Sequence, residues 1–238
     1  MVLYYHGISP QQRAQFARQM DVLLHHTVPI RADFATPLPK NGRFACVTFD
    51  DGLVSFAERA LPELEKRGIP AAIFAVSGKL GQEPDWANYS DEPLTTERTM
   101  TSSQLREIAD RALIGSHTTT HPMLTKLSET EAARELEESR KALEGLLNKN
   151  VTLFSFPYGD FNDALIKWSS AAGYKRVFTT LPFAFESESG AEASVVGRIS
   201  VEPTDWPLEF RLKVLGAYQW LPIAFAVKRN IQFLFNKN

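Results

Sequence analysis

The sequence predicts an α/β fold: a barrel of about seven parallel strands with helices on its outside. The chain has 238 residues, a length that suits a single α/β barrel of ~200–250 residues. Strand-like and helix-like segments alternate along the chain, and such alternation produces a parallel sheet with helices on its faces. No Gly-x-Gly-x-x-Gly turn follows any expected strand, which favours a barrel over a dinucleotide-binding fold.

The expected strands are short apolar runs bounded by turn residues. In chain order they cover residues 2–5, 45–49, 71–76, 113–115, 151–156, 177–180 and 195–199. The expected helices begin at capping side chains or end at a glycine. They cover residues 10–25, 55–67, 102–111, an amphipathic stretch from 129, and 163–172. The polar stretch 78–99 is expected to be a long loop, and such loops are often functional.

Composition and charge narrow the classes of function. The 26 Lys and Arg nearly balance the 28 Asp and Glu, for a net charge of −2, so the chain has no general basic footprint for nucleic acid. Cys46 is the single cysteine, which excludes an internal disulfide. The residues after Met1 do not resemble a signal peptide, and no apolar run reaches the ~18–20 residues of a membrane-spanning helix. These features predict a cytoplasmic protein.

The clearest polar motif follows the second expected strand, where residues 48–52 read Thr-Phe-Asp-Asp-Gly. The adjacent carboxylates of Asp50 and Asp51 repel each other unless a cation or a shared proton intervenes. An ordinary turn or helix N-cap would also explain an Asp-Gly pair at this position. The motif alone therefore leaves both interpretations open.

Two further motifs follow later strands. His117 and His121 lie four residues apart, a spacing at which both imidazoles can face one metal; Pro122 favours a turn over a helix there. Two unrelated surface histidines are the alternative. Residues 154–159, which end in Pro157, Tyr158 and Gly159, form an aromatic-rich strand end. Such a strand end is usually part of the core, so this motif alone is a weak indication of a site.

Together the three motifs predict a catalytic metal site. A barrel places its active site at the carboxyl ends of its strands, and each motif lies at such an end. One carboxylate and two imidazoles form a three-ligand set that leaves positions open for water and substrate. The second carboxylate is then free to act as a general base.

These motifs, in this order, resemble those of the polysaccharide deacetylases, the chitooligosaccharide-deacetylase-like enzymes of carbohydrate esterase family 4. The opening Tyr5-His6-Gly7-Ile8 is also similar, and the resemblance covers about residues 2–200. It implies a distorted (β/α) barrel that removes N-acetyl groups from amino sugars. It also implies a divalent metal, usually zinc, on Asp51, His117 and His121. Asp50 would be the base, and the Tyr158 N–H, next to Pro157 in the substrate-binding turn, would stabilise the oxyanion.

Two features of the family pattern are missing. The arginine that usually begins the third motif is replaced by Ser155, and no histidine follows His121 to act as the usual general acid. We hypothesise that Arg198, at the end of the last expected strand, replaces the arginine and pairs with Asp50; a surface ion pair is the alternative. His6, at the end of the first strand, can serve as the acid or bind substrate, unless it is a structural histidine.

The pattern changes after residue 205, which predicts a barrel over residues 1–205 and a helical, aromatic and basic tail over 206–238. Trp220 and the basic pair Lys228-Arg229 lie among aliphatic residues, a composition that suits peripheral contact with a membrane surface. A terminal helix that closes the barrel is the alternative. The oligomeric state is not predicted.

The function predicted from the sequence is metal-dependent N-deacetylation of an amino-sugar glycan or a lipid-linked glycan precursor. Two alternatives stay open. One keeps the metal but changes the bond, as in a deformylase or another C–N hydrolase acting on a small or lipid-linked substrate. The other is a carbohydrate-binding protein that retains a metal without catalysis.

Overall fold

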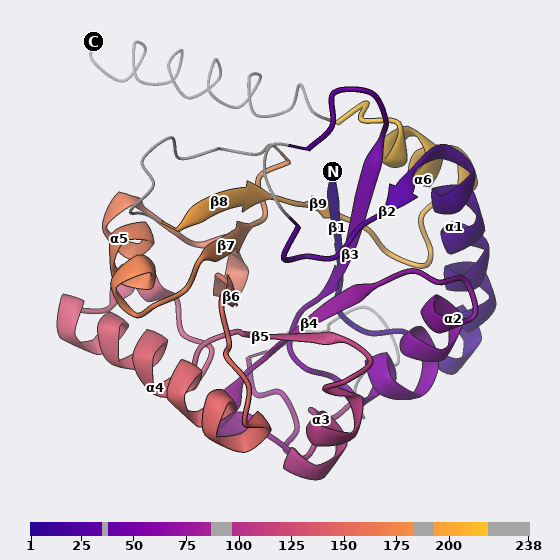
Figure 1. Cartoon of the computed structure of the whole chain (residues 1–238). Helices are drawn as coiled ribbons and strands as arrows, with labels where there is room; N and C mark the ends of the chain where they lie inside the picture. Colours follow the sequence, from indigo (N-terminus) through magenta and orange to yellow (C-terminus); the bar gives the residue numbers. More distant parts are fainter. Residues whose placement is uncertain (35–37, 87–96, 183–192, 219–238) are drawn as a thin grey trace, which may run out of the picture.

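A computed structural model describes residues 1–34, 38–86, 97–182 and 193–218. Its centre is a parallel sheet that is nearly closed into a barrel, with helices packed around the outside (Figure 1). The sheet order is β8-β7-β6-β5-β4-β3-β1-β9, and the short β2 pairs with β3 outside this path. The predicted barrel of parallel strands is thus confirmed.

The strands lie close to the predicted positions. They are β1 (Val2–Tyr5), β2 (Val28–Pro29), β3 (Phe44–Phe49), β4 (Ala71–Ala75), β5 (Leu113–Ser116), β6 (Leu153–Ser155), β7 (Arg176–Thr179), β8 (Ser194–Gly197) and β9 (Ile199–Ser200). The last predicted strand is divided in two. Its first part pairs with β7 and its second part with β1, so one segment joins the two edges of the sheet, and Arg198 lies at the division.

The helices are α1 (Arg13–His26), α2 (Leu61–Glu65), α3 (Ser102–Ile108), α4 (Glu129–Leu147), α5 (Asp163–Ala171) and α6 (Pro207–Val214). Three of them, α3, α4 and α5, start at their predicted residues, whereas α1 starts at Arg13 after a 3-10 turn over Pro10–Gln12. The helix expected over 55–67 begins instead with a π-helical turn, Phe56–Ala60. The proline at position 62 has no N–H to donate to Glu58, which weakens the i→i−4 pattern in that turn.

Alternate strand residues fill two apolar layers, as the two-residue period of a strand requires. The larger layer lies between the sheet and the helices, and it includes Leu3 and Val47. The smaller layer includes Val2, Cys46 and Phe74. The ring of Phe74 meets that of Phe178 from β7, with 5.2 Å between centroids, so bulky side chains fill the barrel interior and leave the chemistry to its ends.

The first part of the predicted tail belongs to the packed domain. Helix α6 lies beside α1 (Figure 1), and its Phe210 and Val214 are buried in the larger apolar layer. Trp206 is 78% exposed. The remaining tail, residues 219–238, lies outside the described residues, so membrane contact by that segment stays a prediction. Among the helices of the described residues, none has both the length and the hydrophobicity of a membrane-spanning segment.

Candidate active site

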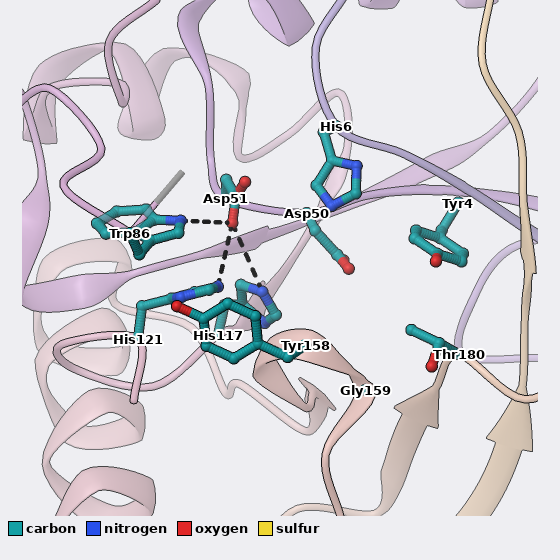
Figure 2. A pocket seen from close by; sticks show the side chains of 10 residues that line it. All are labelled: Tyr4, His6, Asp50, Asp51, Trp86, His117, His121, Tyr158, Gly159 and Thr180. Atoms are coloured by element: carbon teal, nitrogen blue, oxygen red, sulfur yellow. Dashed lines mark hydrogen bonds and ion pairs between the residues drawn. The ribbon is translucent and has the colours of Figure 1, made fainter. Parts of the chain in front are cut away.

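Six of the eight predicted site residues line one cavity of about 240 Å³ at the carboxyl ends of the strands. Figure 2 shows the side chains that point into it. They come from the ends of β1, β3, β5, β6 and β7 and from the segment after β4. The lining residues are Tyr4, His6, Asp50, Asp51, Trp86, His117, His121, Tyr158, Gly159 and Thr180. Pro157 is buried and is not among them.

Asp50 and Arg198 form a buried two-point ion pair beneath this cavity. The guanidinium donates from NH1 to Asp50 Oδ1 and from NH2 to Oδ2, both at 2.7 Å. NH2 also donates to Ser155 Oγ at 2.7 Å, and Nε donates to the Thr179 carbonyl at 3.2 Å. Arg198 has 0% exposure, so the alternative of a surface ion pair is excluded. An arginine thus reaches Asp50 from the division between β8 and β9.

This ion pair controls the protonation of Asp50. Burial alone raises the pKa of a carboxyl group. The positive charge and the hydrogen bonds of Arg198, together with His117 and His6, outweigh that effect and hold the pKa of Asp50 well below its usual range. Asp50 is therefore a carboxylate at neutral pH, oriented at both oxygens and able to accept a proton.

Asp51, His117 and His121 are arranged as a set of metal ligands. One ligand atom from each lies within 4.8 Å of the others, and all three residues are buried. Asp51 Oδ1 is 3.6 Å from His117 Nε2 and 3.4 Å from His121 Nε2 (dashed lines in Figure 2). A single divalent ion bound to all three would leave positions for water and substrate, as catalytic zinc sites do.

The tautomer of His117 tests whether a cation fits here. Its Nδ1 lies 2.7 Å from the carbonyl oxygen of Ser155; a carbonyl only accepts, so Nδ1 carries the proton. In the neutral ring, Nε2 then presents a lone pair to the carboxylate oxygen of Asp51. Two such acceptors repel each other, whereas a cation between them attracts both. A backbone carbonyl that fixes the tautomer of a histidine ligand is a common feature of metal sites.

His121 is held in the neutral form that binds metals. Burial, reinforced by the neighbouring His117, lowers the pKa of His121 to about 3. Its ring packs between the rings of Trp86 and Tyr158, with centroids 4.7 Å away on each side. Its Nδ1 is buried and has no hydrogen-bond partner among the described residues.

The backbone at the site is strained in the left-handed region. Asp51, Thr118, His121 and Tyr158 have φ of 67°, 69°, 63° and 59°. Among the described residues Asn148 is the one other non-glycine with positive φ, and it caps α4. Non-glycine residues in this conformation cost ~1–3 kcal/mol each and persist only where surrounding contacts enforce them. Their concentration at one cavity indicates that the fold is under functional constraint there.

Helix α4 enforces the strained turn that carries His121. The carboxylate of Glu135 accepts from the Thr119 and Thr120 backbone N–H groups at 2.8 and 3.0 Å and from Thr120 Oγ1 at 2.7 Å. Ser139 donates to the Thr118 carbonyl at 2.9 Å. The sequence offers no signal for Glu135, because a glutamate on an amphipathic helix looks like any solvated charge. The structure places it one helical turn before Ser139, which is buried.

Replacement of Glu135 by alanine is expected to loosen the histidine turn. Two backbone N–H groups lose their acceptor, which should lower the free energy of unfolding by about 1 kcal/mol, the lower end of the usual range because the site is partly exposed. The affinity for zinc should fall as well, since His121 loses its support. Glu138→Ala, an exposed change on the same helix, is the matched control. Equal zinc affinity in both variants, measured by calorimetry, would contradict this role.

Comparison with known proteins identifies the family of this chain. The family model described as polysaccharide deacetylase matches residues 38–177. YxkH of Bacillus subtilis (strain 168), a candidate polysaccharide deacetylase, is 27% identical over 214 residues, which cover 85% of this chain and 71% of that protein. A poly-β-1,6-N-acetyl-D-glucosamine N-deacetylase of Staphylococcus aureus (strain MRSA252) is 29% identical over 154 residues. That match covers 59% of this chain and 50% of the relative, so the chain spans only part of each protein.

Solved structures share the fold. IcaB from Ammonifex degensii superposes with a TM-score of 0.71 at 24% identity, over 92% of this chain and 95% of that one. The Streptococcus pyogenes deacetylase PplD gives 0.70 at 21% identity, over 90% and 96%. The family match covers more than half of the chain and includes the double aspartate, both histidines and the Pro-Tyr-Gly turn; the protein therefore belongs to the polysaccharide deacetylase family.

Proposed function

We propose that this protein is a metal-dependent hydrolase that removes acetyl groups from the N-acetylated amino sugars of a glycan or lipid-linked glycan precursor. The observation that carries the proposal is that a carboxylate fixed by an arginine and a set of three metal ligands lie side by side at one cavity. Asp50, fixed by Arg198, lies beside the ligand set of Asp51, His117 and His121. The N-deacetylase activity named for the Staphylococcus aureus relative supports the choice of an acetylated amino sugar.

The donor set favours zinc, because two imidazoles and one carboxylate are typical of catalytic zinc. Asp51, His117 and His121 would hold the cation, and its contribution would be Lewis-acid chemistry toward a water molecule and the acetyl carbonyl. The remaining steps fall to the side chains and backbone of this chain.

Asp50 is assigned the role of general base. Its two oxygens are already bound to Arg198, so little reorganisation is needed when it accepts the proton from the attacking water. The ion pair also keeps it ionised below neutral pH. Arg198 is thus a positioning residue, which acts on the reaction through the carboxylate.

Tyr158 is assigned two roles on the substrate side. Its backbone N–H is the donor proposed for the oxyanion that forms when water adds to the acetyl carbonyl. Tyr158 is 49% exposed and lines the cavity, so its ring offers an apolar face to a sugar. The next residue can only be glycine: a Cβ on Gly159 would lie 1.9 Å from Thr180 Oγ1.

His6 is the proposed general acid that protonates the leaving amine. It lines the cavity with Asp50, and Figure 2 shows the two side chains on the same side of it. Its ring also meets that of Tyr4 edge-on, with 5.7 Å between centroids, which restricts the imidazole.

The His6→Ala variant is expected to lose about 10²–10⁴-fold in kcat/KM. It should also lose the alkaline limb of the pH–rate profile, where a general acid gives up its proton. His25→Ala, an exposed change on α1 that does not line the cavity, is the control. A His6→Ala profile that keeps both wild-type limbs would remove His6 from the role of acid and leave it a substrate-binding group at most.

The products test the function as a whole. Zinc-loaded protein should be incubated with a panel of N-acetylated and N-formylated amino-sugar oligomers and lipid-linked amino sugars. We expect acetate and free amines from acetylated members, detected by mass spectrometry. Formate release in place of acetate would indicate a deformylase. Binding without any product would instead support a carbohydrate-binding protein.

A further inference from the structure

The indole of Trp86 contacts two of the three proposed metal ligands, although it lies in the segment after β4 that the sequence marked only as a polar loop. Its Nε1–H donates to Asp51 Oδ1 at 3.2 Å. Its ring is stacked on that of His121, with 4.7 Å between centroids and 22° between planes. Figure 2 shows Trp86 covering this side of the ligand set.

The hydrogen bond from Trp86 is to Oδ1, the proposed ligand oxygen of Asp51. Asp51 Oδ1 is the atom that faces both His117 Nε2 and His121 Nε2. A carboxylate oxygen offers more than one lone-pair direction. A donor on one of them therefore fixes the rotation of the carboxylate and directs another lone pair toward the histidines.

The stacking contact fixes the second ligand. His121 has no hydrogen-bond partner for Nδ1 among the described residues, so the usual polar restraint on a ligand imidazole is missing. The near-parallel indole limits tilting of the His121 ring. The Tyr158 ring contacts the same imidazole in a T-shaped arrangement, with 70° between the planes. Trp86 is held in turn by its neighbour Asp85, which accepts from Lys79 at 2.7 Å.

We propose that Trp86 is a positioning residue of the metal site, which orients Asp51 through its indole N–H and His121 through ring stacking. The inference rests on the proposed function, because it assumes that these residues bind a divalent cation. It adds a residue from the segment after β4 to a site otherwise built from the strand ends. It also predicts that the emission of this tryptophan reports metal binding.

Two variants separate the contacts. Trp86→Phe removes the N–H donor and keeps an aromatic ring, and Trp86→Leu removes both. Removal of a group that orients a metal ligand usually weakens metal affinity 10–100-fold. We expect a drop of about tenfold for Trp86→Phe and a larger one for Trp86→Leu. Trp206→Phe, which changes a largely exposed tryptophan, is the matched control and should bind zinc as the wild type does.

The experiment is a zinc titration of metal-free protein, followed by calorimetry and by tryptophan emission. The wild type and Trp206→Phe should show a saturable emission change that Trp86→Phe lacks, while the metal-free variants unfold at similar temperatures. Unchanged zinc affinity in both Trp86 variants would overturn this inference and leave the proposed function standing. Failure of the wild type to bind zinc would overturn both.

Discussion

The Asp50→Asn variant should lose nearly all deacetylase activity while it still binds zinc. The amide cannot accept a proton from water, and loss of a general base costs about 10²–10⁴-fold in rate. The proposed ligands Asp51, His117 and His121 are unchanged, so zinc affinity should stay within a few-fold of the wild type. Two measurements on the same preparation check this prediction. Acetate release at saturating zinc tests the loss of activity, and calorimetry tests the retained zinc affinity.

The control for this change is Asp33→Asn, which alters an exposed aspartate paired with Arg31 and should leave kcat/KM unchanged. Asp50→Asn also leaves Arg198 with a neutral partner, so circular dichroism must show that the variant is folded at the assay temperature. A folded Asp50→Asn protein with turnover within tenfold of the wild type would contradict the assignment of Asp50 as base.

Arg198→Met should be the most destabilising single change at the site. The guanidinium is fully buried and binds both oxygens of Asp50. Removal of one partner of a buried ion pair leaves an uncompensated charge and costs about 3–5 kcal/mol. The pKa of Asp50 should rise, because burial raises it once Arg198 no longer opposes that effect. The free energy of unfolding in urea measures the loss.

The double variant Asp50→Asn/Arg198→Met identifies the origin of that loss. With no charge left unpaired, it should recover part of the stability lost in Arg198→Met. Arg198→Lys keeps the charge but cannot reproduce the two parallel N–H donors, so turnover should fall even where the protein is stable. Near-normal turnover in Arg198→Lys would show that the orientation of Asp50 does not limit the reaction.

The sequence was sufficient for the parts of the fold and site that depend on local pattern. Apolar runs placed the strands, and the capping pairs at Thr101 and Ser128 placed α3 and α4. Because parallel strands end together, motifs at their carboxyl ends had to meet, as Asp51, His117 and His121 do.

Other features depend on contacts between distant residues. The split of the last strand follows from its pairing with both β7 and β1, which no local signal encodes. Glu135 and Trp86 contact the site from a helix and a loop whose residue types are ordinary for those elements. Arg198 could be predicted only because the third motif lacks its usual arginine, so that no local residue was available to orient Asp50.

Metal dependence is the most direct test of the account. Protein stripped with a chelator and shown by elemental analysis to be metal-free should release no acetate from an N-acetylglucosamine oligomer. Addition of one equivalent of zinc should restore activity in the wild type but not in Asp51→Asn, which lacks a ligand charge. Full acetate release by verified metal-free protein would contradict the proposed role of Asp51, His117 and His121.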